Sequence, residues 1–329
     1  MGELEQHRIL ILGWPMNPKQ EWLKNYPFVT ATRIYQEGLS WSQKRWMNAS
    51  FHAPCWLQKL DKLKQSSWYG DWRNNIEDYD TVIIIDEVRG RDVFEYILAR
   101  NPRCRICVFY DSPIKAGSTR EPSQYRDLPI HFYTCDRKIA ADYDIMFTPY
   151  FYIFSPMDFQ AYEQLVGSDS KVDVFFLGEE KGDRLERLSE LRTMFDGAGV
   201  KHDLRLVRKR HGRRYSKAEK AQTTEYMSYF EYLRHIRESK AILELVSAGQ
   251  SGITQRPYEA LFFQKKLITT CTEVQNYDFY CSDNVLVINQ EIPLSETDIK
   301  QFINSPFRPV AREIKEKYTF SSWLQRLLS

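Results

Sequence analysis

The sequence has no long apolar run and few cysteines. No apolar stretch approaches the roughly 20 residues that span a bilayer. The opening MGELEQHRILILGW contains acidic residues and too short an apolar run for a signal peptide. The 6 cysteines are dispersed through 329 residues, which is typical of reduced thiols rather than of a disulfide framework. We therefore expect a cytoplasmic protein.

The sequence also has almost no net charge, because 46 Lys and Arg residues balance 44 Asp and Glu residues. This balance argues against a general polyanion binder, and no recognition helix, zinc finger or RNP motif indicates nucleic acid. The exception is the basic run RLVRKRHGRRYSKAEK within Lys201 to Lys220. Such a run is either a solvated loop or a contact for an anionic lipid surface, a lipid-linked pyrophosphate or an acidic polysaccharide.

Metal-ligand and cofactor motifs are missing as well. The 6 histidines form no HxxxH or HxxE grouping, no GxxxxGK[ST] loop indicates ATP, and RILILGWPMNP lacks the GxGxxG of a Rossmann dehydrogenase. DxD spacing occurs at Asp78-Tyr79-Asp80 and at Asp142-Tyr143-Asp144. Neither follows a buried strand, so we interpret both as turn and cap residues. We predict no metal site and no cofactor.

Aromatic residues, by contrast, are abundant at 14% of the chain, and the 43% hydrophobic content is that of a packed globular protein. Five tryptophans stand among Lys and Arg in one segment: Trp41, Trp46, Trp56, Trp68 and Trp72. They are explained equally by core packing of an irregular helical insert and by contact with sugar faces or a membrane interface.

Alternating strands and helices are predicted in the first half of the chain. Apolar runs predict strands at Arg8 to Leu12, Thr81 to Ile85 and Arg105 to Tyr110. The amphipathic stretch Arg91 to Arg100 lies between the second and third strands, which favours a βαβ crossover and a parallel sheet. We predict a Rossmann-like domain over residues 1–160.

A second alternating pattern begins after the polar segment GSDSK, where the run Val172 to Leu177 predicts a new strand. The pattern of strands and helices then continues, so we predict a second α/β domain over residues 170–309. Residues 310–329 follow it, and the run from Val310 to Leu328 predicts one final helix.

The loop FLGEEKGDRLE follows the first strand of this second domain. Gly178 and Gly182 allow a turn whose backbone approaches a ligand closely. Lys181 and Arg184 place cationic groups at the carboxyl end of a strand, where α/β sheets usually bind their ligands. A solvated, charged turn is the alternative interpretation.

The stretch Gln250 to Thr269, QSGITQRPYEALFFQKKLIT, combines a small-residue turn, a short helix and a strand. Arg256 can donate two hydrogen bonds to a phosphate, and Glu259 can accept from a pair of ribose hydroxyls. Ordinary helix capping explains the same residues. The candidate nucleotide-binding residues of this stretch are Gln250, Ser251, Gly252, Thr254, Arg256 and Glu259.

The run Ser239 to Tyr280, SKAILELVSAGQSGITQRPYEALFFQKKLITTCTEVQNYDFY, resembles the C-terminal signature of bacterial lipopolysaccharide or capsular polysaccharide biosynthesis proteins, which are similar to GT-B glycosyltransferases. The resemblance covers about the last half of the chain. It implies an α/β fold with two Rossmann-like domains facing across a cleft, the first on the acceptor side and the second holding a nucleotide-sugar donor. It also implies that residues 310–329 pack back on the first domain.

Residue roles follow from this resemblance. Glu259 takes the place of the glutamate that binds the donor ribose, and Lys181 and Arg184 take the place of basic residues on the donor diphosphate. A metal-independent transferase stabilises the departing nucleoside diphosphate with such cations and with backbone donors. An inverting enzyme also needs a base for the acceptor hydroxyl. Asp86 and Glu87 rank first for that role and Asp111 next, because all three follow predicted strands.

The function hypothesis is therefore a glycosyltransferase that moves a sugar from a nucleotide-sugar donor to a surface glycan or a lipid-linked glycan acceptor. Peripheral contact with an anionic membrane at the inner membrane face belongs to this hypothesis, and nucleic acid does not. The alternative is a non-catalytic glycan- or nucleotide-binding protein of a polysaccharide assembly complex.

Overall fold

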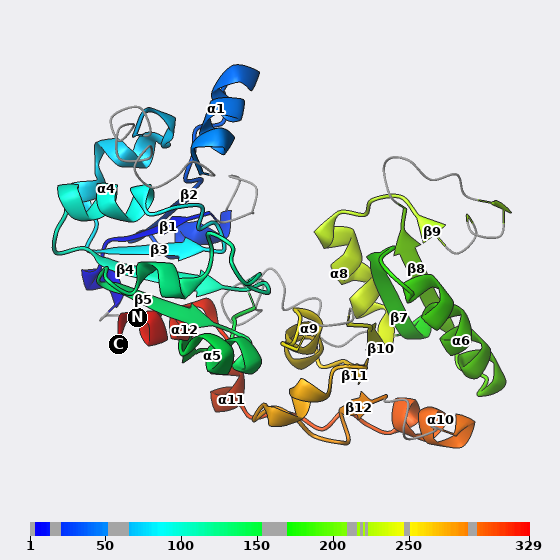
Figure 1. The fold of residues 1–329 in the computed structure, drawn as a ribbon. Coiled ribbons are helices and arrows are strands. Elements are labelled where there is room, and N and C mark those ends of the chain that lie inside the picture. Colours follow the sequence, from blue (N-terminus) through cyan, green and yellow to red (C-terminus); the bar gives the residue numbers. More distant parts are fainter. Residues whose placement is uncertain are drawn as a thin grey trace. The chain divides into compact units, whose positions relative to one another are not determined.

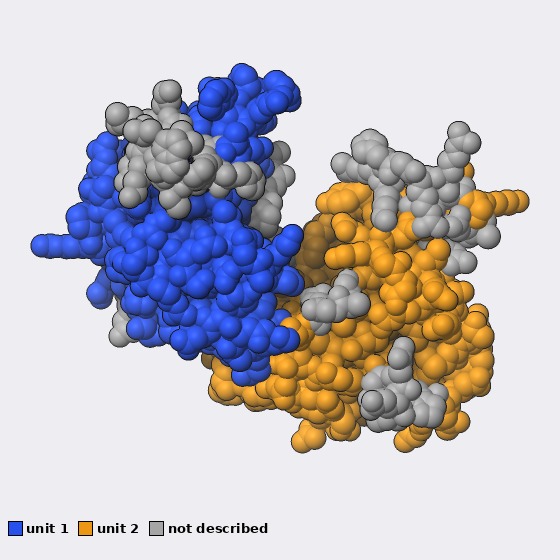
Figure 2. All heavy atoms as spheres, in the orientation of Figure 1, with its two compact units in different colours: residues 1–150, 323–329 blue, residues 151–322 orange. Residues whose placement is uncertain are grey.

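The chain divides into two compact units (Figure 2). Unit 1 comprises Met1–Tyr150 with Trp323–Ser329, and unit 2 comprises Phe151–Ser322. The computed structural model describes residues 4–13, 21–51, 66–152, 170–208, 216–217, 220, 223–246, 251–288 and 295–329. Within these residues each unit contains one six-stranded sheet, and every strand pair is parallel.

The sheet of unit 1 has the order β2-β1-β3-β4-β5-β6 (Figure 1). Its strands are β1 (Ile9–Leu12), β2 (Val29–Thr32), β3 (Thr81–Ile85), β4 (Arg105–Tyr110), β5 (Ile130–Thr134) and β6 (Met146–Phe147). β1 and β3 are buried along their whole length, which is why their sequences are continuous apolar runs without alternation. The three strands predicted in this half are confirmed, with β1 one residue shorter.

Helices cover both faces of this sheet. The helices of unit 1 are α1 (Trp41–Phe51), α4 (Asp92–Arg100), α5 (Arg137–Tyr143) and α12 (Phe320–Leu328), with short 3-10 helices at Leu4–Gln6, Glu21–Asn25, Ser66–Trp68, Asp71–Asn74, Ile76–Asp78 and Pro122–Tyr125. α4 buries Val93, Phe94 and Ile97 in one core. On the other face Trp323 of α12 packs edge-to-face on Phe109 at 5.2 Å between ring centroids.

The sheet of unit 2 has the order β12-β11-β10-β7-β8-β9. Its strands are β7 (Val172–Glu179), β8 (His202–Val207), β9 (Thr223–Thr224), β10 (Ser239–Glu244), β11 (Lys266–Thr269) and β12 (Val285–Val287). The chain adds β8 and β9 on one side of β7, and it then crosses over to add β10, β11 and β12 on the other side. The sheet therefore has its topological switch point between β7 and β10, and ligands of open α/β sheets bind at the carboxyl ends of such a strand pair.

The helices of unit 2 are α6 (Arg184–Gly197), α8 (Tyr229–Arg237), α9 (Arg256–Phe262), α10 (Glu296–Asn304) and α11 (Arg312–Glu316), with a 3-10 helix at Thr272–Asn276. α6 and α10 share one core with β7, β8 and β10. α8 and α9 lie on the opposite face, where Tyr232 of α8 contacts Phe175 of β7 at 5.7 Å between ring centroids. Both units are thus α/β layers that are Rossmann-like in general.

One helix expectation is wrong. The final segment does not form a single helix from Val310 to Leu328 but two, α11 and α12. The reason is a new helix start at Thr319, whose hydroxyl accepts a hydrogen bond from the backbone N–H of Ser322 at 3.4 Å. An N-cap residue has a non-helical backbone conformation, so one helix cannot run through Thr319.

Candidate functional site

Three arginines gather at the switch point of the second sheet. Arg184, the first residue of α6, donates from Nη1 to the Glu179 carbonyl at the end of β7, at 2.8 Å, and from Nη2 to the Leu245 carbonyl after β10, at 3.0 Å. One helical turn later, Arg187 donates to the Val246 carbonyl at 3.3 Å. The two side chains therefore join the carboxyl ends of the two strands that flank the switch point.

The third arginine, Arg256, begins α9. Its Nη2 donates to the Leu177 carbonyl of β7, and its Cζ lies 5.4 Å from the ring centroid of Phe176. Burial and the positive charges of Arg256 and Arg187 lower the pKa of Arg184. Arg184 and Arg256 both donate to carbonyls near the end of β7, those of Glu179 and Leu177, so their positive charges lie at the same strand end. The buried Nε of Arg256 has no hydrogen-bond partner within the described residues.

Gly178 is needed for this arrangement. A Cβ at this position would lie 2.8 Å from Cζ of Phe176 and 3.4 Å from Nη1 of Arg184. Any side chain would push the phenyl ring that lies against Arg256. The glycine therefore positions the arginines by allowing a close approach.

Two buried glutamates balance the arginines. Glu244, the last residue of β10, is fully buried. Its Oε1 accepts from the hydroxyl of Thr254 at 2.5 Å, and its Oε2 accepts from the hydroxyl of Thr269 at 2.5 Å. The Thr254 hydroxyl also accepts from the backbone N–H of Arg256 at 3.2 Å. Glu244 thus fixes the turn that leads into Arg256.

Glu259, the second glutamate, is only 2% exposed. Its Oε1 accepts from the Tyr229 hydroxyl at 2.8 Å, and its Oε2 accepts from the Tyr232 hydroxyl at 2.5 Å. Burial raises the pKa of Glu259, while Arg256 and the two tyrosines act to lower it. The role of Glu259 toward a ribose stays a prediction, and it requires a tyrosine hydroxyl to give up its place.

The remaining donor-binding candidates lie around these side chains. Lys181 is exposed, and its carbonyl accepts from the backbone N–H of Arg184 at 3.3 Å, which closes the turn before α6. Gly252 is buried and Ser251 is half-buried. Gln250 lies outside the described residues.

The carboxyl edge of the first sheet carries acids instead. Asp86 follows β3 with a φ of 60°, and the backbone N–H of Glu87 donates to the Ile85 carbonyl at 2.7 Å. A three-residue turn of this kind is uncommon and strained, and such strain concentrates at functional sites. The Asp86 carboxylate accepts hydrogen bonds from Ser112 and from Arg120.

Asp111, which follows β4, lies next to Asp86. Desolvation, the negative charge of Asp86 and a hydrogen bond shared with Asp86 raise the pKa of Asp111 to about 7. Asp111 is exposed to solvent, so desolvation alone does not explain its raised pKa. The neighbouring carboxyl of Asp86 contributes as well. The structure brings these two candidates together.

Glu87 has different neighbours. Burial raises the pKa of Glu87, while Arg89 and Arg33 act to lower it. Gly13, at the end of β1, has a φ of 83°, and a Cβ there would lie 3.0 Å from Cβ of Glu87. The first sheet has its switch point between β1 and β3, so Asp86 and Glu87 follow a strand that flanks it, whereas Asp111 follows β4, one strand further along.

Several residues of these edges were not singled out from the sequence: Arg120, Arg187, Tyr229, Tyr232 and Glu244. Two of them carried a signal. Glu244 ends an apolar strand, as Asp86 and Asp111 follow theirs, and Arg187 is one helical turn from Arg184. The tyrosines and Arg120 reach the edges only through tertiary structure, so no spacing marked them.

The cap interpretation of the DxD spacings is confirmed for Asp144, whereas Asp78 ends a 3-10 helix and Asp142 lies within α5. Asp80 accepts from the backbone N–H of Arg8 at 2.7 Å. Asp144 is the left-handed C-cap of α5, and Asp142 pairs with Lys138 one turn earlier on the same helix. Across the described residues no group of His, Cys, Asp and Glu could hold a metal ion. None of the helices described is long and apolar enough to cross a membrane.

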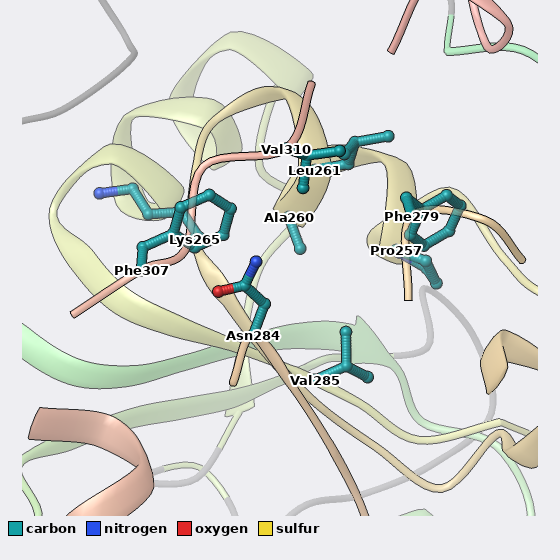
Figure 3. Close-up of a pocket in the computed structure, with 9 residues that line it drawn as sticks. All are labelled: Pro257, Ala260, Leu261, Lys265, Phe279, Asn284, Val285, Phe307 and Val310. Carbon is teal, nitrogen blue, oxygen red and sulfur yellow. The ribbon is translucent and has the colours of Figure 1, made fainter. Parts of the chain in front are cut away.

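A small cavity beside α9 is a packing feature rather than a ligand site (Figure 3). Its volume is about 10 Å³, room for at most one water molecule. Burial and Arg237 lower the pKa of Lys265 to about 8. The Lys265 amine points away from the other lining residues and donates to the Arg237 carbonyl at 2.7 Å.

No protein-family model matches the chain, and no curated protein matches its sequence.

Proposed function

We propose that the chain is a metal-independent glycosyltransferase that moves a sugar from a nucleotide-sugar donor to a surface glycan or a lipid-linked glycan acceptor. The observation that carries the proposal is the group of Arg184, Arg187 and Arg256 at the switch point of the second sheet. Negative charge develops on the departing nucleoside diphosphate during glycosyl transfer. Guanidinium groups held in advance at that position stabilise this charge without reorganisation.

Two further features support a diphosphate site there. α6 has 14 residues and begins at Arg184, so its N-terminal N–H groups add positive potential at the same edge. Lys181 is exposed on the turn before this helix, where its amine can reach a bound anion. The ribose contact of Glu259 and a GT-B-like arrangement of the two units across a cleft complete the proposal.

Asp111 is our first choice for the base. Asp86 accepts hydrogen bonds from Arg120 and Ser112, and its negative charge helps to raise the pKa of Asp111 to about 7. A carboxyl that is half ionised near neutral pH is suited to accept a proton from an acceptor hydroxyl. In this role Asp86 and Arg120 position and tune Asp111.

Thermal-shift and calorimetric titrations with UDP, GDP, CMP, TDP and their sugars test the proposal. We expect one nucleotide family to stabilise the native chain, and its sugar to be hydrolysed or transferred in the presence of EDTA. The Asp111→Asn variant should bind the same nucleotide with reduced turnover. Stabilisation by none of the nucleotides contradicts the proposal, and binding without turnover supports the non-catalytic alternative.

A further inference from the structure

α1 of unit 1 exposes two large aromatic side chains. Trp41 is 75% exposed and Trp46 is 69% exposed. Two other tryptophans of the same segment, Trp68 and Trp72, are buried, which confirms core packing for those two. Trp56 lies outside the described residues. Exposed indoles place apolar surface in water, so a partner that covers them lowers the free energy.

The orientation of α1 is fixed from its inner side. Met47 is 7% exposed and packs with Leu39 and Trp68 in a small separate core. Successive residues of a helix are rotated by about 100°, so Trp41 and Trp46 are about 140° apart and flank the face opposite Met47. Figure 1 shows α1 extending away from the sheet of unit 1. The two indoles therefore lie on opposite flanks of the exposed side of α1.

The exposed charges of α1 are positive. Lys44 and Arg45 are exposed on α1, and the sequence WSQKRWMNASF has no acidic residue. The guanidinium of Arg45 lies 5.3 Å from the ring centroid of Trp41, so one indole already carries a cation on its face.

We infer that α1 is a docking surface for an anionic lipid bilayer. Indole rings are amphipathic and settle at the level of lipid headgroups, and Lys and Arg beside them are attracted to anionic headgroups. The bilayer interface is soft, so it accepts indoles on both flanks of one helix at once. This surface goes beyond the proposed catalytic function, because it requires neither the arginines of unit 2 nor the acids of unit 1.

Co-sedimentation of the full chain with vesicles tests the inference. We expect binding to vesicles of phosphatidylglycerol and phosphatidylcholine that weakens with salt, and little binding to phosphatidylcholine alone. The double variant Trp41→Ala, Trp46→Ala should lose about tenfold or more of the partition coefficient. Arg45→Gln should lose about fivefold, as expected for one basic residue near an anionic surface.

A matched control lies in unit 2, where Tyr226 is 71% exposed and Phe230 is 69% exposed. The double variant Tyr226→Ala, Phe230→Ala removes similar exposed aromatic area and should bind vesicles like the native chain. Circular dichroism confirms that both double variants are folded.

The inference is overturned if the native chain ignores anionic vesicles or if the tryptophan variant binds them unchanged. It is also overturned if the tryptophan substitutions dissolve a dimer without changing vesicle binding, since α1 would then serve self-association. Nucleotide binding is measured on the same variants and should be unaffected, so failure of this inference is distinguishable from failure of the proposed function.

Discussion

The carboxyl edges of the two sheets share one architecture but carry different charged groups. In unit 1 two aspartates stand next to one arginine, and the pKa of Asp111 is raised to about 7. In unit 2 three arginines, each anchored on a backbone carbonyl, stand among the buried glutamates Glu180, Glu244 and Glu259. Different residues follow the strands of the two sheets, and our proposal assigns a proton acceptor to the first edge and an anion site to the second.

The largest effect is expected from Arg256→Ala. The substitution leaves Glu244 and Glu259 buried near one another without their closest cation, so the free energy of unfolding of unit 2 should fall by about 3–5 kcal/mol. All 8 tryptophans lie outside residues 151–322, so tryptophan fluorescence does not report on unit 2. Hydrogen exchange of the β10 amides in increasing urea is the suitable measurement.

Arg192→Ala is the control for this variant. Arg192 belongs to α6 and, like Arg256, donates to a strand carbonyl, that of Leu204 at 2.5 Å, but Asp196 rather than a glutamate is its charged neighbour. It should cost about 1 kcal/mol, the value of one hydrogen bond. Equal losses of unfolding free energy in the two variants would mean that Arg256 contributes no more than an ordinary hydrogen bond to a strand carbonyl.

Gly178→Ala should have the next largest effect. The new Cβ would lie 2.8 Å from the Phe176 ring, so the ring and Arg256 must move, at a cost of about 1–3 kcal/mol. We expect nucleotide affinity to fall together with stability, as measured by calorimetry and thermal unfolding. Gly38→Ala is the comparison, because nothing lies within 4 Å of its Cβ position. A stable Gly178→Ala variant would show that the ring does not constrain the arginines.

The central strands of both sheets could be predicted from the sequence, because burial on both faces requires continuous apolar runs such as TVIII and RICVFY. The edge strands β2 and β9 are short and lack such runs, and they were not predicted. Asp86, Asp111 and Arg184 could be predicted as edge residues for the same reason. Function could not be read from position alone. Asp136 also follows a strand, β5, yet its carboxylate caps α5 through the backbone N–H groups of Lys138 and Ile139.

The partners of Glu259 could not be predicted either. Tyr229 and Tyr232 lie 30 and 27 residues earlier in the chain and reach Glu259 only because α8 and α9 cover the same face of the sheet. Sequence spacing describes neighbours within one helix or strand. It carries no information on which side chains meet between two helices.

Asp111→Asn tests the acidic edge of the first sheet through the pH dependence of its stability. Because the pKa of Asp111 in the folded chain is about 7, above its usual 3.8, the folded state holds a proton that the unfolded chain releases at lower pH. The contribution of this group to stability therefore falls as pH rises from about 4 to about 7, and it is constant above that range.

The Asn variant lacks this term, so its stability relative to the native chain should increase from pH 5 to pH 8. Solvent screening keeps the difference below about 2 kcal/mol. Thermal unfolding of both proteins over this range is the measurement. A constant difference would mean that Asp111 has an ordinary pKa, which would remove our reason to prefer it as the base.

Lys181→Ala should have the smallest effect on stability, within about 0.5 kcal/mol, because the side chain is exposed. If its amine contacts the diphosphate, nucleotide affinity should still fall about tenfold, the loss of one charge-assisted hydrogen bond. Calorimetry separates the two quantities. Unchanged affinity would assign Lys181 to the solvated turn and leave the anion site to the arginines.

The central claim is that the arginines of unit 2 hold the diphosphate of a nucleotide sugar. Calorimetric titration of nucleoside diphosphates into the native chain, Arg256→Lys and Arg192→Lys tests it most directly. We predict that one diphosphate binds the native chain and Arg192→Lys equally, and that its affinity falls about tenfold or more in Arg256→Lys, because an ammonium lacks the planar fork of a guanidinium. Absence of binding to the native chain, or equal affinity in all three proteins, would contradict the account.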